Sequence, residues 1–171
     1  VNPTFNPNDF KNEKEVRVFS NPLVENVYEM GSIIKPLTMA AGLDAKVITA
    51  ASTYTDMGTI ELDGKRISNH DGKARGVVSM QEVLNQSLNL GVSFVVTKLG
   101  KEFFATYIRD FGLGERTGID LPNESIGLIK NLTSKRDVEY ATASFGQGIA
   151  LTPIATVRAL SSLGNGGTLI T

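Results

Sequence analysis

Apolar residues recur along most of the chain at the three- and four-residue spacing of an amphipathic helix. The spacing predicts helices over residues 32–43, 46–51, 90–99, 101–111 and 153–163. Pro36 falls in the first turn of the first helix, where a missing backbone N–H costs least. Glycines at positions 100, 112 and 164 are expected to end three of these helices. The pattern therefore indicates a chain built mainly from helices.

Polar residues at the starts of the apolar stretches predict where several helices begin. Ser32 is a candidate cap for the first helix. Ser79 followed by Glu82 fits a capping box, in which the serine hydroxyl and the glutamate satisfy free backbone N–H groups. Thr152 followed by Pro153 predicts the start of the last helix, with threonine at the cap and proline in the first turn.

A short stretch with the pattern of a β-hairpin interrupts the predicted helices. Residues 59–67 contain two runs of strand-forming residues around Asp63-Gly64, which is a typical hairpin turn. Asn- and Pro-rich residues 1–27 predict loop with a short helix, and Gly-rich residues 112–131 predict an extended loop. The length of 171 residues suits about one domain or a piece of a larger one.

Composition and charge exclude several classes of protein. Hydrophobic residues make up 41% of the chain and charged residues 20%, which excludes a mainly disordered state. A formal net charge of -1 argues against binding to nucleic acid. Without cysteine, and with His70 as the one histidine, the sequence offers no disulfide, no thiolate or multi-histidine metal site and no cysteine nucleophile.

The ends of the sequence predict that it belongs to a longer protein. The first residues contain loop-forming Asn and Pro and no initiating Met, and residues 164–171 stop where a new strand is expected. No stretch has the roughly 18–20 apolar residues of a membrane span. The first residues also lack the basic start and apolar run of a signal peptide.

Ser32 and Lys35 form the first candidate for chemistry. Residues three apart lie on one face of a helix, so a lysine amine there can reach the serine hydroxyl. Apolar neighbours such as Ile34 and Leu37 should lower the pKa of the lysine, because burial disfavours its charged form. A neutral amine would then accept the hydroxyl proton and make Ser32 a nucleophile. The free N–H groups of a helix start would also stabilise a developing oxyanion.

Taken singly, each of the short motifs is weak evidence. The 12 serines and 10 lysines in 171 residues are expected to produce close to one Ser-x-x-Lys pair by chance. Ser87 and Asn89 form a Ser-x-Asn pair, which alone would be an ordinary helix boundary. Residues 144–148, SFGQG, would alone be a tight turn, or a place where another backbone approaches closely.

Together, these segments point to a known family. Residues 28–41, YEMGSIIKPLTMAA, resemble the active-serine segment of penicillin-binding proteins, and residues 87–89, SLN, match their second motif, S-x-N. The segments 111–122, 144–153 and 163–167 follow in the family's order. The resemblance covers residues 6–167 and is specific to class B, monofunctional peptidoglycan D,D-transpeptidases.

The resemblance implies an α+β fold of the serine β-lactamase and D,D-peptidase type. It also implies peptidoglycan cross-linking through a serine acyl-enzyme on stem peptides that end in D-Ala-D-Ala. Ser32 would be the nucleophile and Lys35 its general base. Ser87 would relay a proton to the leaving amine, and Asn89 would hydrogen-bond the substrate backbone or the Lys35 side chain. β-Lactams would acylate Ser32, and neither a metal nor an organic cofactor is implied.

The resemblance further implies a place in the cell. Family members are usually anchored by one N-terminal membrane helix on the outer face of the bacterial cytoplasmic membrane, and they work beside a cell-wall glycan polymerase. Nothing in these 171 residues shows that helix.

The third family motif, K-[ST]-G, is absent from the sequence. Arg116-Thr117-Gly118 differs from this motif only in its first residue, but it precedes the 144–148 segment. In the family, the motif follows the position of Gly167 and lies on an inner strand. We therefore expect residues 1–171 to be a partial transpeptidase domain that lacks the N-terminal strands and the C-terminal K-[ST]-G strand. Such a chain is expected to be inactive alone and to self-associate through its exposed apolar surface.

Three alternatives stay open at this stage. A serine β-lactamase shares the fold and needs a glutamate that positions water, for which Glu115, Glu124 and Glu139 lie in the right region without a recognisable motif. A non-catalytic β-lactam sensor or scaffold of the cell-wall machinery would bind partners without needing Ser32. A helical bundle with coincidental motifs would form no β-lactam adduct.

Overall fold

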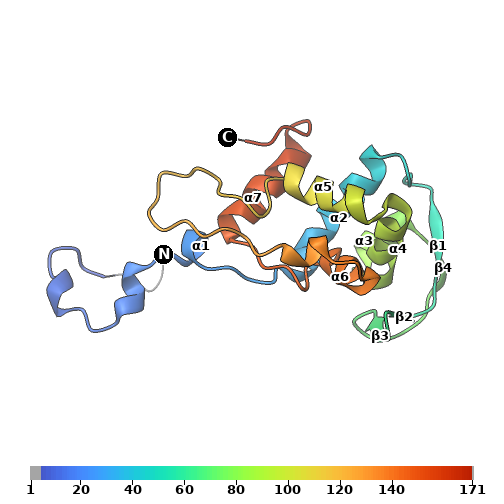
Figure 1. Cartoon of the computed structure of the whole chain (residues 1–171), viewed down its shortest axis with the longest axis horizontal. Helices are drawn as coiled ribbons and strands as arrows, with labels where there is room; N and C mark the ends of the chain where they lie inside the picture. The colour runs from blue at the N-terminus through green and yellow to red at the C-terminus, as the bar shows by residue number, and fades with distance from the viewer. Residues whose placement is uncertain (1–4, 171) are drawn as a thin grey trace.

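The computed structural model describes residues 5–170. An arm formed by the N-terminal residues extends from one end of the molecule, the larger helices form the middle, and four short strands lie at the opposite end (Figure 1). The α-helices are α1 Pro22–Glu25, α2 Lys35–Asp44, α3 Met80–Asn85, α4 Asn89–Leu99, α5 Lys101–Asp110, α6 Asp137–Ala143 and α7 Pro153–Ser161. Single-turn 3-10 helices are η1 Phe10–Asn12, η2 Val16–Phe19, η3 Gly31–Ile34, η4 Lys130–Thr133 and η5 Ser162–Gly164.

The strands form two separate antiparallel pairs, one nested inside the other in the sequence. The outer pair joins β1 Thr53–Asp56 to β4 Gly76–Ser79, and the inner pair joins β2 Thr59–Leu62 to β3 Lys65–Ser68. Asp63 and Gly64, between β2 and β3, both have positive φ angles, +49° and +71°. This is the backbone of a two-residue hairpin turn.

The core lies among α2, α4, α5, α6 and α7, and it continues under α3 and the strands. Its fully buried side chains include Leu37 on α2, Val92 on α4 and Phe104 on α5. Burying each such side chain contributes about 1.5–3 kcal/mol. The apolar side chains that recur at helical spacing in the sequence therefore face this interior.

Two helix contacts are unusually close because a glycine lies at the point of approach. A Cβ atom at Gly91 of α4 would lie 2.3 Å from a methyl group of Val83 on α3. A Cβ atom at Gly42 of α2 would lie 2.5 Å from a methyl group of Val95 on α4. These contacts hold α3 against the first turn of α4, and the last turn of α2 against the second half of α4.

Most of the predicted helix boundaries are confirmed. The Ser79 hydroxyl accepts a hydrogen bond from Glu82 N, and the Thr152 hydroxyl accepts one from Ala155 N. The predicted hairpin, the loop before η4 and the helices over 32–43, 90–99, 101–111 and 153–163 are also present within one to three residues. Of the region predicted as loop with a short helix, residues 1–4 lie outside the described residues.

Three expectations about the helices and strands are wrong or incomplete. No helix forms over residues 46–51, because the chain turns at Lys46, whose φ is +58°. Ser32 does not cap α2: it lies inside η3, and α2 begins at Lys35. The sequence pattern did not reveal β1, β4 or α6, which are only four to seven residues long.

Among residues 5–170, no helix is long and apolar enough to cross a membrane. The same residues contain no group of three or more His, Cys, Asp or Glu side chains placed to hold a metal ion.

Candidate active site

Ser32 lies on the exposed side of η3, one residue after a backbone contact that fixes its place. Gly31 N donates a hydrogen bond of 3.1 Å to the carbonyl oxygen of Gly146. The tight 3-10 turn leaves the Ser32 hydroxyl exposed to solvent, while Ile34 is fully buried beneath it. Ser32 is therefore held in place and open to a ligand.

Lys35 is the first residue of α2 and is only 2% exposed. Its Nζ donates hydrogen bonds to the Ser87 hydroxyl at 2.9 Å and to the Ser87 carbonyl oxygen at 2.5 Å. Burial lowers the pKa of Lys35 to about 8, since removal from water disfavours the charged ammonium. At pH 7 about a tenth of the lysine is then neutral, far more than for an exposed lysine.

Ser87 lies between Lys35 and Ser32. Its hydroxyl is 3.0 Å from Ser32 Oγ and completes a chain of hydrogen bonds from Lys35 Nζ to the exposed serine. The sequence predicted that Lys35 reaches Ser32 directly, whereas the structure connects them through Ser87. Ser87 follows α3 and has a φ of +53°, a left-handed backbone that is uncommon outside glycine and costs about 1 kcal/mol.

Asn89 is the first residue of α4 and is half-buried. Its Nδ2 donates a hydrogen bond of 2.9 Å to the carbonyl oxygen of Ser68 at the end of β3. The contact with Lys35 that the sequence analysis considered is therefore not the one observed. Asn89 instead connects the α3–α4 junction to the hairpin.

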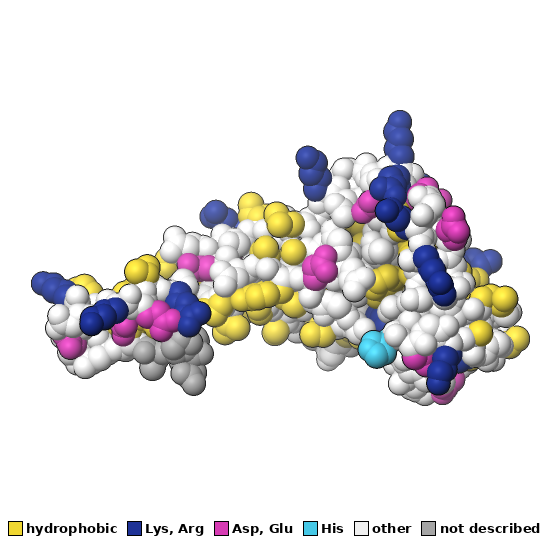
Figure 2. Space-filling view, turned by 90° about the horizontal axis from the view of Figure 1, so that it is seen from below, with side chains coloured by type: hydrophobic (Ala, Val, Ile, Leu, Met, Phe, Trp, Pro, Cys, Tyr) yellow, Lys and Arg dark blue, Asp and Glu magenta, His cyan; other side chains and the backbone are white. Residues whose placement is uncertain are grey.

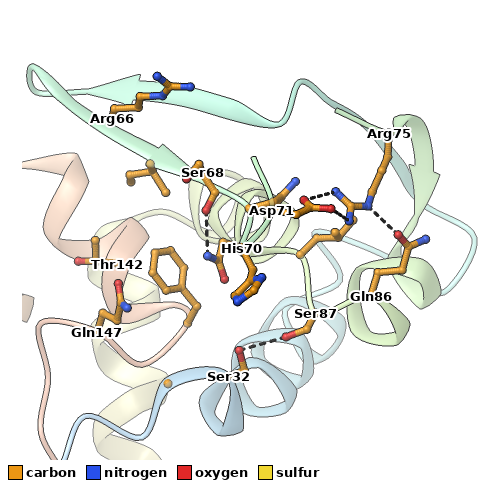
Figure 3. A pocket seen from close by; sticks show the side chains of 16 residues that line it. Ser32, Arg66, Ser68, His70, Asp71, Arg75, Gln86, Ser87, Thr142 and Gln147 are labelled. Carbon is orange, nitrogen blue, oxygen red and sulfur yellow. Dashed lines mark hydrogen bonds and ion pairs between the residues drawn. The ribbon is translucent and has the colours of Figure 1, made fainter. Parts of the chain in front are cut away.

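These residues border an open cleft of about 690 Å³. The cleft is lined by Gly31 and Ser32, by residues 66–71 with Arg75, by residues 86–89, and by Thr142, Phe145 and Gln147. In Figure 3 the Ser87 hydroxyl points to Ser32, while Thr142 and Gln147 lie on the opposite side of the cleft from Arg75. The cleft is large enough for a small peptide or a drug-sized molecule.

The 144–148 segment forms the floor beside Ser32. Gly146 has a φ of +75°, and a Cβ atom there would lie 2.3 Å from the Gly31 carbonyl oxygen. Thr38 Oγ1 donates a hydrogen bond to the Ser144 carbonyl oxygen, and Gly148 N donates one to Glu29 Oε1. The sequence analysis considered a turn or a close backbone approach here, and both occur.

Comparison with known proteins agrees with this geometry. The family model described as the penicillin binding protein transpeptidase domain matches residues 1–171. The chain belongs to the penicillin-binding protein transpeptidase family. The Bacillus subtilis protein named stage V sporulation protein D is 39% identical over 170 residues, which cover 99% of this chain and 26% of that protein.

A second relative and two solved structures support the same family. The Escherichia coli peptidoglycan D,D-transpeptidase FtsI is 30% identical and is matched by 96% of this chain, over 27% of its own length. A Burkholderia ambifaria crystal structure, described as a peptidoglycan glycosyltransferase, superposes with a TM-score of 0.83 at 25% identity, covering 89% of this chain and 48% of that one. Penicillin binding protein 3 from Mycobacterium tuberculosis gives 0.79 at 27% identity, over 86% and 33%.

The comparisons establish the family and the fold class. The chain belongs among the class B penicillin-binding proteins and has the mixed α and β fold that the resemblance implied. It spans about a quarter of the length of these curated relatives.

Two groups of residues considered in the sequence analysis lie away from the cleft. Arg116-Thr117-Gly118 lies in the loop before η4, where Thr117 N and its hydroxyl donate hydrogen bonds to Glu124. Burial of Glu124 acts to raise its pKa, but these bonds and one from Gly118 outweigh it, so the pKa is lowered. Glu115, Glu124 and Glu139 are not among the residues that line the cleft.

The sequence analysis missed several polar residues near the site. Asn69, His70 and Arg75 line the cleft, and Asp56 lies behind them with 1% of its surface exposed. The polar residues after β3 show no recognisable motif in the sequence. Their hydrogen-bond partners lie in distant segments: Asp56 in β1, and residues at the two ends of the α3–α4 junction. The one available signal was that buried Asn and Asp must find hydrogen-bond partners.

Proposed function

We propose that Ser32, Lys35 and Ser87 form the acyl-transfer centre of a peptidoglycan D,D-transpeptidase. The observation that carries this proposal is the hydrogen-bonded chain from buried Lys35 Nζ through Ser87 Oγ to exposed Ser32 Oγ. The substrate is a stem peptide ending in D-Ala-D-Ala. Family membership and the names of relatives such as the Escherichia coli D,D-transpeptidase support this choice.

The first step is acylation of Ser32. Neutral Lys35 takes a proton from Ser87, which takes the proton of Ser32, while Ser32 Oγ bonds to the carbonyl carbon before the last D-Ala. As the tetrahedral intermediate collapses, the bond from that carbon to the D-Ala nitrogen breaks. Lys35 returns the proton through Ser87 to the leaving amine. D-Ala departs, and an ester remains on Ser32.

The second step transfers the acyl group to an amine of a neighbouring strand. The amine nitrogen bonds to the ester carbon, the bond from that carbon to Ser32 Oγ breaks, and the amine proton returns to Ser32 along the same chain. Asn89 keeps one amide N–H and its Oδ1 besides the bond to Ser68, and these hold the substrate backbone. β-Lactams enter the same cleft and acylate Ser32.

We further propose that the complete site includes a K-[ST]-G strand from outside these 171 residues. That strand would bind the substrate carboxylate and supply one oxyanion-hole N–H. Loss of one such donor commonly costs about 10²–10³ in rate, so the 171-residue chain alone should acylate very slowly. The whole protein would act on the outer face of the bacterial cytoplasmic membrane, anchored there and beside a glycan polymerase.

The test measures D-alanine release and cross-linked product from a stem pentapeptide and an amine acceptor. The protein used contains the complete transpeptidase domain, with Ser32→Ala as its control. We expect D-alanine and a new peptide bond from the unmodified protein and neither from the variant. Hydrolysis of penicillin with rapid turnover, and no cross-linked product, would instead support a β-lactamase. A stable penicillin adduct without any cross-linked product would support a β-lactam sensor, and no reaction with either compound would support a scaffold.

A further inference from the structure

Helix α4, which follows Ser87, begins without a capping side chain of its own. The residue at its N-cap position is Leu88, which has no polar side-chain atom, and no side-chain cap bond forms there. Instead, Leu90 N donates a hydrogen bond of 3.2 Å to Oδ1 of Asn69, a residue 21 positions earlier. Asn69 is only 3% exposed, so this buried hydrogen bond takes the place of the bond that an N-cap side chain would otherwise form.

The direction of the Asn69 amide is fixed by Asp56. Asn69 Nδ2 lies 2.9 Å from both carboxylate oxygens of Asp56, which is 1% exposed. A carboxylate only accepts and the Leu90 N–H only donates, so the amide has one orientation that satisfies both. Beside this pair, Asn89 Nδ2 donates to the Ser68 carbonyl oxygen. Two bonds from consecutive residues therefore attach the start of α4 to the end of β3.

The end of the junction that follows α3 is held by Arg75, a neighbour of Asp56. Arg75 Nε donates a hydrogen bond of 2.6 Å to Oε1 of Gln86, the residue before Ser87. The Arg75 guanidinium also forms an ion pair of 3.0 Å with Asp71 and lies 3.9 Å from Asp56. Figure 3 shows Arg75 between Asp71 and Gln86 at one side of the cleft.

A left-handed Ser87 needs such support. Its backbone conformation is unfavourable by itself, and its hydroxyl must stay near 3 Å from both Lys35 Nζ and Ser32 Oγ for protons to move. Small displacements of groups that transfer protons reduce rates strongly. The contacts on either side of Ser87 therefore bear on catalysis as well as on stability.

We infer that Asn69, oriented by Asp56, is a positioning residue for Ser87 and Asn89. Its amide caps α4 from outside the helix and thereby sets where the Ser87 hydroxyl lies between Lys35 and Ser32. This inference deepens the proposed function and rests on it. It assigns the Asp56–Asn69 pair no contact with substrate.

The test exchanges the two side chains. Asn69→Asp places two buried carboxylates face to face, which disfavours the contact. Asp56→Asn combined with Asn69→Asp restores one donor and one acceptor across it, with the acceptor toward Leu90 N still present. Asn165→Asp is the matched control, because within residues 5–170 the Asn165 side chain forms hydrogen bonds only to the backbone of Thr168, in the same exposed turn.

Two quantities are measured on the protein that contains the complete domain. Stopped-flow mixing with a fluorescent penicillin separates the dissociation constant of the first complex from the acylation rate constant. Hydrogen exchange of the Leu90 amide reports the cap directly. The measurements are made at about pH 9, where a proton shared between the two carboxylates is disfavoured.

We expect Asn69→Asp to lower the acylation rate constant by about 10- to 100-fold, with little change in the dissociation constant. Leu90 exchange should become faster, and the double variant should restore both quantities to within about threefold of the unmodified protein. Asn165→Asp should change neither. If Asn69→Asp does not fold, Asp56→Asn replaces it, with a smaller loss that the double variant restores.

The inference is overturned by unchanged acylation and Leu90 exchange in the single variants, or by a loss that the double variant fails to restore. Failure of the proposed function looks different, because the unmodified protein itself then forms no acyl-enzyme. In that case Leu90 exchange still decides whether Asn69 and Asp56 hold the start of α4.

Discussion

Gly146 packs so closely on Gly31 that a single added carbon atom would overlap the backbone beside Ser32. The Gly31 N–H donates to the Gly146 carbonyl oxygen, and a Cβ atom at position 146 would lie 2.3 Å from the Gly31 carbonyl oxygen. The obstacle is backbone, which cannot rotate away as a side chain does. The position of Ser32 therefore depends on a glycine more than a hundred residues away.

Replacing Gly146 with alanine should disturb both stability and acylation. The positive φ alone costs about 1 kcal/mol for alanine, and the overlap must also displace Gly31. We expect a lower melting temperature and a slower reaction of Ser32 with penicillin. Gly166→Ala is the control, since Gly166 has a φ of +78° with no atom within 4 Å of an added Cβ. Equal effects of the two variants would contradict the close packing at Ser32.

The rate of acylation should depend on pH through Lys35. Its pKa of about 8 means that the neutral amine, which accepts the proton, increases as the pH rises. We expect the acylation rate constant to rise through a midpoint near pH 8 and then level off. A fluorescent penicillin followed in stopped-flow experiments from pH 6 to 10 measures this. A rate that does not change across this range would argue against Lys35 as the base.

The same pKa predicts a pH dependence of stability. Burial lowers the pKa of Lys35 in the folded protein from its ordinary value of 10.5 to about 8, so between these pH values the unfolded chain binds more protons. The folded state is then stabilised as the pH rises through this window. The free energy of unfolding should increase from pH 8 to 10 in the unmodified protein relative to Lys35→Met. A constant difference between the two proteins would mean that the pKa is not lowered.

Two substitutions at Ser87 separate its hydroxyl from its backbone. Both Ser87→Ala and Ser87→Gly remove the proton relay and should slow acylation by about 100-fold. Glycine accepts the left-handed backbone at a φ of +53° without strain, so Ser87→Gly should be more stable than Ser87→Ala by about 1 kcal/mol. Urea unfolding compares the two. A less stable glycine variant would show that the backbone is not strained there.

The 171-residue chain should self-associate through exposed apolar side chains. Val157 on α7 is 62% exposed and Leu128, which pairs with Ala150 just before α7, is 61% exposed. Figure 2 shows hydrophobic side chains gathered along the middle of one face of the molecule. Sedimentation velocity should detect dimers or larger species, and Val157→Glu should reduce them more than Val16→Glu in the N-terminal arm. A monomer at all concentrations would contradict this expectation.

Local signals in the sequence predicted much of the fold. A serine or threonine at a cap, or an Asp-Gly pair in a turn, acts through atoms only a few residues away, as Ser79, Thr152 and Asp63 do here. The strands β1 and β4 were not predicted, because each is four residues long and partly exposed, and because they pair with each other across the nested hairpin. Such pairing leaves little trace in hydrophobic spacing.

Helix spacing and apolar neighbours predicted the Ser32–Lys35 pair and the lowered pKa of Lys35, and the family resemblance added the roles of Ser87 and Asn89. The structure brings Ser32, Lys35 and Ser87 into one hydrogen-bonded chain. The place of Ser87 between the other two depends on its left-handed backbone. That conformation depends in turn on contacts between distant segments, which no local pattern contains.

Intact-mass spectrometry after incubation with a penicillin tests most directly whether Ser32 is the nucleophile. The measurement uses the 171-residue chain, the same chain extended through the next K-[ST]-G, and Ser32→Ala in the extended chain. We predict a stoichiometric adduct on the extended chain, none on the alanine variant, and little or none on the 171 residues alone. An adduct that persists in Ser32→Ala, or no adduct on the unmodified extended chain, would contradict the proposed acyl-enzyme.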